Sequence, residues 1–264
     1  MDLRNNTILL TGGTSGLGLE FATRLVALGN TVLITGRDPF RLAQTQQRLP
    51  QVHTFRSDVS DPAAIASLHG QVISRFPALN MLINNAGEMR RLNLRDPAVN
   101  ALDVTREIDI NLAGPIRMVQ QFLPHLQAQK SAAILNVSSG LAVAPYPLSP
   151  VYGATKAGLH SYTQSLRVQL GRTRVKVFEL LPPSVRTPLN DKFSDIENNP
   201  LVEPEKVVAQ ALKGLENDTW EIYPGMANAL RIISRIAPGF LLKQFSKGMH
   251  EALARPTPTK PSPR

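Results

Sequence analysis

The stretch Thr7-Ile-Leu-Leu-Thr-Gly-Gly-Thr-Ser-Gly-Leu-Gly18 places a short apolar run directly before a turn rich in glycine. Leu17, Phe21 and Leu25 then recur at helical spacing, and Gly29 stands where a glycine commonly ends a helix. The stretch therefore predicts a strand, a glycine loop and a helix in succession. The first N–H groups of such a helix have no partner within it, so the loop is suited to bind a pyrophosphate group.

Two other interpretations of these glycines compete with a pyrophosphate site. The separation of Gly13 and Gly18 also matches the phosphate loop of nucleoside triphosphatases, but Leu19-Glu20 stands where that loop requires Lys followed by Ser or Thr. A triphosphatase loop is therefore disfavoured. A glycine turn with a purely structural role remains the second alternative.

Beyond the loop, apolar runs that predict strands alternate with segments that predict helices. Such alternation implies parallel strands joined by right-handed crossovers. The fold class is therefore α/β, a single Rossmann-type doubly wound parallel sheet with helices on both faces. We expect one domain over residues 1–254, including a helical C-terminal extension at 226–254, and a disordered tail at 255–264. The predicted strands are 7–11, 31–35, 52–57, 79–84, 132–137, 175–181 and 220–223, and the later helices are 39–49, one that opens at Asp61-Pro62, 97–129 and 149–171.

The composition limits the classes of function. The chain of 264 residues has no cysteine, which excludes disulfides, thiolate zinc sites and a cysteine nucleophile. Its net charge of +9 is scattered without a long run of Lys and Arg, so no nucleic-acid partner is expected. The five histidines show no ligand spacing, so no metal site is expected.

The start of the chain bears on its location. Asp2 and Arg4 are followed at once by the first predicted strand, which argues against a secretory signal. No apolar run approaches the ~20 residues that span a bilayer. A cytoplasmic protein is therefore expected.

The end of the second predicted strand, Thr35-Gly36-Arg37, bears on the choice of cofactor. Dinucleotide folds that prefer NAD usually carry an acid here to hold the ribose 2′-hydroxyl. Arg37 offers instead a guanidinium group, which suits a 2′-phosphate. NADP(H) is therefore the favoured cofactor and NAD(H) the second choice, while an arginine that contacts only solvent is the alternative.

Tyr152 and Lys156 are separated by about one helical turn, so both side chains can face one ligand. A free phenol has a pKa near ~10, and a neighbouring ammonium group is expected to lower the pKa of Tyr152. Ser139 follows the strand predicted at 132–137 and can donate a hydrogen bond to a carbonyl oxygen. A Tyr four residues before a Lys is also typical of an exposed helix face, and Ser139 favours the catalytic interpretation.

Taken together, these segments resemble the short-chain dehydrogenase/reductase family. Thr11–Gly18 is similar to the family's Thr-Gly-x3-Gly-x-Gly loop, Asn84-Asn-Ala-Gly87 to its Asn-Asn-Ala-Gly signature, and Asp58-Val59 to its acid-aliphatic pair. The matches follow one another in the family's order from residue 7 to about 190. The residues that match the catalytic tetrad are Asn111, Ser139, Tyr152 and Lys156.

The resemblance implies roles for these residues. Ser139 and Tyr152 would hold the oxygen of a small-molecule carbonyl or alcohol substrate, and Tyr152 would transfer the proton. Lys156 would hold the nicotinamide ribose, and Asn111 would position water in a proton relay. Hydride would pass between NADP(H) and the substrate. The residues implied around the cofactor are Thr11, Gly12, Thr14, Ser15, Gly16, Leu17, Gly18, Arg37, Asp58, Val59, Asn85, Ala86, Gly87, Tyr152, Lys156, Pro182, Val185 and Thr187.

One segment departs from the family pattern. Where the family has Pro-Gly, this chain has Pro182-Pro183. Pro183 removes a backbone donor and fixes φ, so this wall of the pocket is expected to be stiffer. Together with Leu10-Thr-Gly-Gly-Thr14, the segment is similar to the DltE-like subgroup, which names no substrate.

Two functions are compatible with these motifs. The favoured one is an NADP(H)-dependent oxidoreductase that acts on CH–OH and C=O groups and assembles as a homodimer or homotetramer. The alternative is a non-catalytic NADP(H)-binding sensor or regulatory module. Its usual mark would be a degraded tetrad, whereas all four residues are present here.

The surroundings of the tetrad carry weaker signals. Apolar residues between Leu141 and Pro147 predict one wall of the substrate site, although ordinary loop packing would give the same residues. Residues 187–204 predict a mobile lid over the site. Arg90, Arg91 and Arg95 follow the cofactor loop and are expected to face solvent rather than an anionic group.

The C-terminal extension is both apolar and basic. Arg231, Arg235, Lys243 and Lys247 alternate with apolar residues at helical spacing. Such a segment more often covers its own active-site mouth or packs on a partner subunit. Peripheral contact with a membrane is the less favoured interpretation.

Overall fold

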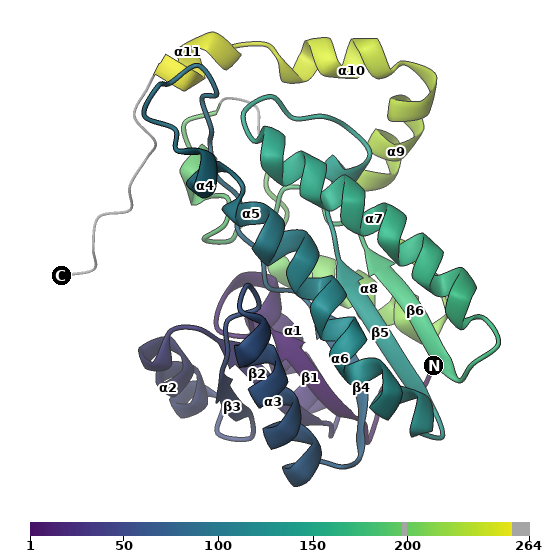
Figure 1. Ribbon diagram of the computed structural model, residues 1–264. Coiled ribbons are helices and arrows are strands. Elements are labelled where there is room, and N and C mark those ends of the chain that lie inside the picture. The colour runs from purple at the N-terminus through teal and green to yellow at the C-terminus, as the bar shows by residue number, and fades with distance from the viewer. Residues whose placement is uncertain (197–199, 255–264) are drawn as a thin grey trace.

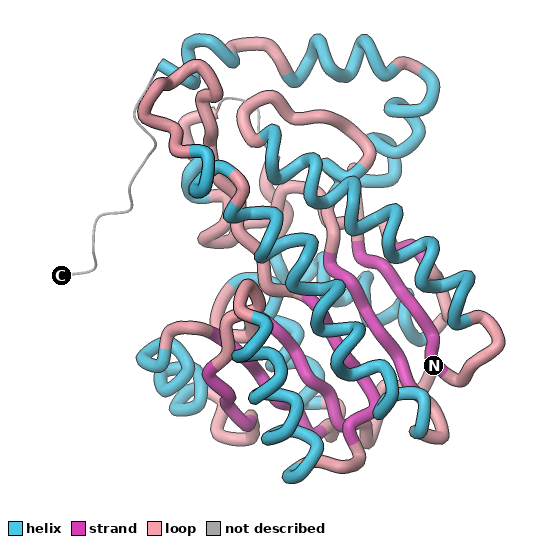
Figure 2. Tube along the Cα trace, viewed as in Figure 1, coloured by secondary structure: helices cyan, strands magenta, loops and turns pink. Residues whose placement is uncertain are grey.

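The computed structural model describes residues 1–196 and 200–254 and contains a seven-stranded parallel sheet, which confirms the predicted fold class (Figures 1 and 2). The strand order β3-β2-β1-β4-β5-β6-β7 reverses beside β1, and ligands of such sheets bind at the carboxyl ends of the strands next to this point. The tail predicted at 255–264 lies outside the described residues. The strands are β1 (Thr7–Thr11), β2 (Thr31–Gly36), β3 (His53–Arg56), β4 (Leu79–Asn84), β5 (Ala132–Val137), β6 (Val175–Leu180) and β7 (Glu221–Ile222).

Helices cover both faces of the sheet because its strands are apolar on both sides. In β1, Leu10 packs in one cluster with Phe21 and Val207, whereas Leu9 packs on the other face with Phe122. Figure 1 shows α3, α6 and α7 side by side over the second face. The first face is covered by α1 (Gly16–Ala27), α2 (Pro39–Arg48) and α8 (Pro204–Glu216), and the second by α3 (Pro62–Arg75), α6 (Gly114–Ala128) and α7 (Pro150–Leu170).

Local sequence explains where several of these helices begin and end. Asp38 caps α2 by accepting hydrogen bonds from the backbone of Phe40 and Arg41, and Asp61 caps α3 in the same way. A proline follows each of these acids at the first helical position, where no N–H is needed. Gly29 ends α1 with a φ of +81°, a value that favours glycine.

The helical stretch predicted at about 97–129 begins at Ala101 and is not one continuous α-helix. The chain instead forms α4 (Ala101–Val104), α5 (Arg106–Ile108), a π-helical turn η1 (Asp109–Ala113) and then α6. Pro115 explains the irregular turn, because it has no N–H to donate to the carbonyl of Asn111 one turn earlier.

The C-terminal extension forms three helices that run across the end of the molecule where the strands terminate (Figure 1, yellow). They are α9 (Ala227–Ile236), α10 (Pro238–Phe245) and α11 (Met249–Ala254). Among the described helices, none combines the length and the hydropathy that crossing a bilayer requires. Two short 3₁₀ turns, η2 (Gly140–Ala142) and η3 (Asp191–Phe193), lie between the main elements.

Candidate cofactor and active site

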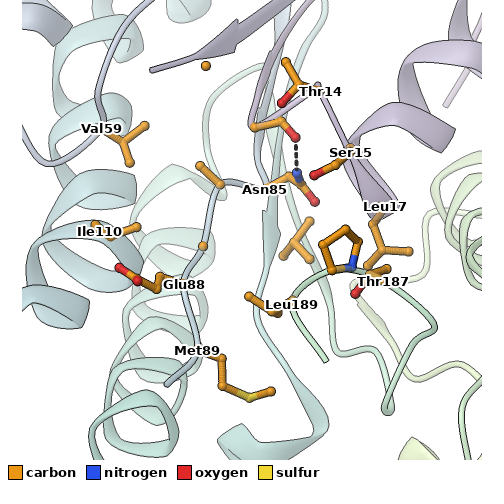
Figure 3. A pocket seen from close by; sticks show the side chains of 18 of the residues that line it. Thr14, Ser15, Leu17, Val59, Asn85, Glu88, Met89, Ile110, Thr187 and Leu189 are labelled. Carbon is orange, nitrogen blue, oxygen red and sulfur yellow. Dashed lines mark hydrogen bonds between the residues drawn. The ribbon is translucent and has the colours of Figure 1, made fainter. Parts of the chain in front are cut away.

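A cleft of about 610 Å³ opens at the carboxyl ends of β1, β2 and β4 to β6. In Figure 3, Val59 and Ile110 lie on one side, Ser15 and Leu17 on the other, and Asn85 between them. The structure therefore brings most of the predicted cofactor residues to one place. Those that line the cleft are Gly12, Thr14, Ser15, Gly16, Leu17, Gly18, Arg37, Asp58, Val59, Asn85, Ala86, Gly87, Tyr152, Lys156, Pro182 and Thr187.

The glycine loop leaves the N-terminus of α1 open toward this cleft. Gly12 and Gly16 have φ values of +69° and +52°, which side chains rarely adopt. A Cβ at Gly18 would lie 2.1 Å from the carbonyl oxygen of Gly12, so no larger residue fits there. The loop is thus a cradle that a side chain would fill, and its free N–H groups suit the pyrophosphate of a dinucleotide.

Thr11 lies beneath the loop and does not line the cleft. Its side chain is buried, and its hydroxyl accepts hydrogen bonds from the backbone N–H groups of Asn85 and Ala86, each at 3.0 Å. Asn85 in turn donates from Nδ2 to the carbonyl oxygens of Thr11 and Gly12 at 3.0 and 3.2 Å. Thr11 therefore fastens the glycine loop to the end of β4.

Three charged side chains border the cleft at the end of β2, namely Arg37, Asp38 and Arg41. The carboxylate of Asp38 accepts the backbone N–H groups that cap α2, and it lies 3.5 Å from Nε of Arg41. The acid is thus turned toward its own helix. Arg37 is exposed at the rim.

Tyr152 and Lys156 face the cleft from the first turns of α7, and both are buried. Burial raises the pKa of Tyr152 to about 12, a hydrogen bond with Ser139 opposes this rise, and the negative charge of Glu107 adds to it. The prediction that Lys156 lowers the pKa of Tyr152 is therefore wrong for the folded chain. The pKa of Tyr152 is raised because burial disfavours the phenolate more than any neighbouring group favours it.

Lys156 is held by the neighbouring strand. Its Nζ donates to the carbonyl oxygen of Val137 at 3.0 Å and lies 5.6 Å from the centre of the Tyr152 ring. Burial lowers the pKa of Lys156 to about 8, and the negative charge of Glu179 opposes this change. The ammonium group can therefore lose its proton in mildly alkaline solution.

Ser139 and Asn111 do not line the cleft itself but lie behind its lining. The hydroxyl of Ser139 accepts the backbone N–H of Leu141 at 3.1 Å and so starts η2. Asn111, fully buried in η1, accepts the N–H of Glu88 at 2.8 Å and donates to its carbonyl oxygen at 2.7 Å. Asn111 therefore fixes the backbone that follows the Asn85–Gly87 segment.

The segment after β6 supplies one more wall. Pro182 and Thr187 line the cleft, whereas Val185 is buried and pairs with Val202 as an isolated parallel bridge. The carbonyl oxygen of Pro182 accepts the N–H of Gly140 at 2.8 Å, which ties this wall to η2. The lid predicted at 187–204 is held at its two ends, and residues 197–199 lie outside the described residues.

The prediction that Arg90 and Arg91 face solvent is wrong. Arg90 is buried, donates to Asp103 at 2.6 Å, and has Nε 3.6 Å from a carboxylate oxygen of Glu107. Arg91 donates to Asp195 at 3.2 Å and to the carbonyl oxygen of Ala252 at 3.3 Å. Buried arginines need such partners, and they lie at positions that sequence spacing does not reveal. Arg95 is exposed as predicted.

Sequence reasoning also missed a polar cluster behind Lys156. Glu179 is fully buried in β6 and accepts hydrogen bonds from the Ser138 hydroxyl at 2.6 Å and from Nδ1 of His160 at 2.8 Å. The sequence signal that could have indicated this cluster is an acid inside a strand covered on both faces, because such a charge is rarely buried without a partner.

His160, Glu179 and Glu221 place ligand atoms within 4.8 Å of one another, a set that their sequence spacing did not predict. Protein groups already use these atoms, since Gln164 and Tyr223 donate to the two oxygens of Glu221 at 2.9 and 3.2 Å. Nδ1 of His160 likewise holds Glu179. The cluster is explained as a hydrogen-bond network.

An apolar group of residues lies beside Tyr152, where a substrate would meet it. Met89, Leu148 and Phe193 pack there with Ala252 of α11, and Leu141 and Tyr146 adjoin them. Tyr146 also packs edge-on against Phe245 of α10, with ring centres 5.6 Å apart. The C-terminal extension therefore covers this end of the cleft, as predicted.

A glycine loop at the reversal of a parallel sheet, with a buried tyrosine and lysine in the same cleft, defines the class of dinucleotide-binding oxidoreductases. The chain belongs to the short chain dehydrogenase family, whose model matches residues 6–198.

One relative matches almost the whole chain. The chain is 40% identical over 248 residues to the uncharacterized oxidoreductase DltE of Bacillus subtilis (strain 168), and the match covers 93% of this chain and 98% of that protein. The predicted resemblance to a DltE-like subgroup is thereby confirmed.

Solved structures show the same fold. A short chain dehydrogenase from Burkholderia cenocepacia in complex with NADP is similar with a TM-score of 0.79 and 25% identity, over 93% of this chain and 99% of that one. A short chain dehydrogenase/reductase from Burkholderia phymatum in complex with NAD has a TM-score of 0.79 and 21% identity, over 99% of both chains.

Proposed function

We propose that the protein is an NADP(H)-dependent carbonyl reductase in which Tyr152 is the proton donor. The observation that supports this most directly is the position of Tyr152 and Lys156, buried in the cleft that the glycine loop also lines. Bound NADPH would supply a hydride to the substrate carbonyl carbon. The polypeptide would bind both molecules, exclude water and provide the proton.

The pKa of Tyr152 supports the reducing direction. A pKa of about 12 keeps the phenol protonated at neutral pH, so Tyr152 is ready to donate. The oxygen of a carbonyl that accepts a hydride becomes an alkoxide, which is a stronger base than a phenolate and takes this proton. Ser139, whose hydroxyl interacts with Tyr152, would donate a second hydrogen bond to the same oxygen.

Lys156 and Asn111 would act around this proton donor. Lys156 has one N–H directed to Val137, and its other two donors would hold the hydroxyl groups of the nicotinamide ribose. The hydrogen bonds of Asn111 to Glu88 keep the backbone beside Gly87 in place, which positions the wall that the nicotinamide would contact. This role is a modification of the water-positioning role that the family resemblance implied.

The residues at the end of β2 support NADP(H) over NAD(H). Arg37 and Arg41 place two guanidinium groups at the rim, where a 2′-phosphate of the adenosine ribose would lie. Asp38 also borders the cleft, but its Oδ1 accepts the N–H groups that cap α2, and its Oδ2 lies 3.5 Å from Nε of Arg41. Charge-assisted hydrogen bonds to a phosphate would therefore be available, while Asp38 would have to exchange its present partners to hold a ribose hydroxyl of NAD.

Fluorescence titration of the full chain with NADPH and NADH tests the cofactor site. We expect tighter binding of NADPH, and we expect Arg37→Ala to weaken NADPH binding about ten- to a hundredfold, since a hydrogen bond to a charged group contributes ~1.5–3 kcal/mol. NADH binding should be unchanged. Arg48→Ala, an exposed arginine at the other end of α2, is the matched control.

The same proteins then test the chemistry with a panel of aldehydes and ketones. Tyr152→Phe should bind NADPH as the parent does but reduce carbonyls at least ~100-fold more slowly, as expected for loss of a general acid. Turnover at the parental rate would refute the role of Tyr152. Tight cofactor binding without turnover of any carbonyl by the parent would instead favour a cofactor sensor.

A further inference from the structure

The C-terminal helices α9 and α10 have one side that packs on the protein. Ala227 and Leu241 are buried, and Leu230 packs against Gly140 of η2. The ring of Phe245 meets that of Tyr146 beside the apolar end of the cleft. The covering role described above therefore accounts for this inner side.

The outer side of the same helices is apolar and exposed. Among the described residues, six of the twelve exposed large hydrophobic side chains fall within residues 226–242. Ile236 is 78% exposed and Phe240 is 57% exposed, which is costly for side chains of this size in water. The six side chains are Met226, Ile232, Ile233, Ile236, Phe240 and Leu242.

The charged side chains of this segment are all basic. No Asp or Glu occurs between Glu221 and Glu251, whereas this stretch contains four Lys or Arg residues. Arg231 lies over the ring of Tyr223 at 4.7 Å, and Arg235, Lys243 and Lys247 are exposed. A partner for this surface must therefore be both apolar and negatively charged.

Charge argues against a second copy of this chain as that partner. A two-fold interface pairs the same patch with itself, so it would bring basic side chains against basic side chains without an acid between them. Nucleic acid is negatively charged but offers no apolar surface for Ile236 and Phe240. An anionic lipid bilayer offers both, because its phosphates lie directly above its acyl chains.

We propose that the outer side of α9 and α10 is a docking surface for an anionic membrane. The exposed isoleucines and Phe240 enter the boundary of the acyl chains, while Arg235, Lys243 and Lys247 contact lipid phosphates. Because the inner side of the same helices covers the apolar end of the cleft, docking brings that end to the bilayer. An apolar substrate dissolved in the membrane then meets the cleft without crossing water.

Sedimentation of the full chain with vesicles tests this proposal, with phosphatidylcholine alone or mixed with phosphatidylglycerol. We expect binding to the mixed vesicles, little binding to phosphatidylcholine alone, and release in high salt, where exposed charges are screened. Ile236→Asp/Phe240→Asp and Lys243→Glu/Lys247→Glu should each reduce binding at least about tenfold. NADPH titration and thermal unfolding of the same variants test whether they are folded.

Matched controls carry the same chemical changes elsewhere. Val168→Asp introduces an acid at an apolar position of α7 that is 81% exposed, and Arg48→Glu reverses an exposed charge on α2. Both should bind vesicles as the parent does. Since no turnover is measured, the result is independent of the proposed reductase function.

Two outcomes would overturn the proposal. One is a parent protein that stays in the supernatant with phosphatidylglycerol vesicles, or binds equally well after both double substitutions. The other is seen by light scattering without lipid: if Ile236→Asp/Phe240→Asp splits an oligomer into smaller species, the surface is an interface between copies of the chain.

Discussion

Glu107 and Glu179 are both fully buried acids beside the proposed active site, but they are stabilised in different ways. Glu107 adds to the raised pKa of Tyr152 and is paired with Arg90. Glu179 opposes the lowered pKa of Lys156 and is paired with His160, whose pKa the hydrogen bond to Glu179 raises. One acid therefore has an arginine as its counter-charge, and the other has a histidine, a residue type whose charge depends on pH.

The two pairs also differ in hydrogen bonding. Both oxygens of Glu179 accept a side-chain hydrogen bond, from Ser138 and His160. Oε2 of Glu107 and Nε of Arg90 are buried 3.6 Å apart without a hydrogen bond partner among the described atoms. Because the charges of Arg90 and Glu107 are buried with incomplete hydrogen bonding, removing only one of the two residues is expected to be costly.

The largest effect is expected from removal of Arg90. Arg90→Met should lower the free energy of unfolding by about 3–5 kcal/mol, because it leaves Glu107 buried without a counter-charge. Denaturant unfolding of the parent and the variant measures this. The control is the double variant Arg90→Met/Glu107→Gln, which should recover part of the lost free energy of unfolding. A loss below about 1 kcal/mol in Arg90→Met alone would show that Glu107 does not need the arginine.

A smaller, pH-dependent effect is expected from His160→Leu. The hydrogen bond to Glu179 raises the pKa of His160 above 6.5. Its contribution to stability is therefore fully present below pH 6.5 and is lost as the pH rises through the raised value. We expect a loss of about 1.5–3 kcal/mol in the acidic range, shrinking above it.

The two variants should respond to pH in opposite directions. Burial raises the pKa of Glu107 above 4.5, and Arg90 limits this rise. In Arg90→Met the pKa should rise further, so the loss in free energy of unfolding should grow as the pH increases from 4.5. Unfolding curves recorded across the pH range compare the two slopes. Parallel slopes would mean that the two clusters do not differ as described.

The smallest effect is expected from Glu179→Gln. Loss of the negative charge should lower the pKa of Lys156 further below about 8, so the alkaline limit of NADPH binding should move to lower pH. The movement should be less than about one pH unit, equivalent to ~1.4 kcal/mol. Glu221→Gln is the control, because Glu221 belongs to the same cluster but its oxygens accept hydrogen bonds from Gln164 and Tyr223. An unmoved limit would show that Glu179 has only a structural role.

The strands and the glycine loop could be predicted from the sequence because their signals are local. An apolar run between turn residues gives β1, and the free N–H groups of α1 follow from glycines close to each other in the chain. The positions of Tyr152 and Lys156 on one helix face follow from spacing alone. Such features need no knowledge of the tertiary fold.

The buried ion pairs could not be predicted because their partners are distant or irregularly spaced. Arg90 meets Glu107 across a loop, and Glu179 meets His160 from a neighbouring strand. The pKa of Tyr152 was also predicted in the wrong direction, since helical spacing reveals a neighbouring ammonium group but not the depth of burial. Whether a charge is buried is a property of the folded chain.

The π-helical turn at Asp109–Ala113 limits how the length of the chain can vary. Loss of one residue there would rotate the helix before the turn by about 100° relative to α6. Asn111 would then no longer reach both backbone groups of Glu88, although every residue of the tetrad would still be encoded. In evolution, this turn should therefore tolerate substitutions more readily than a deletion.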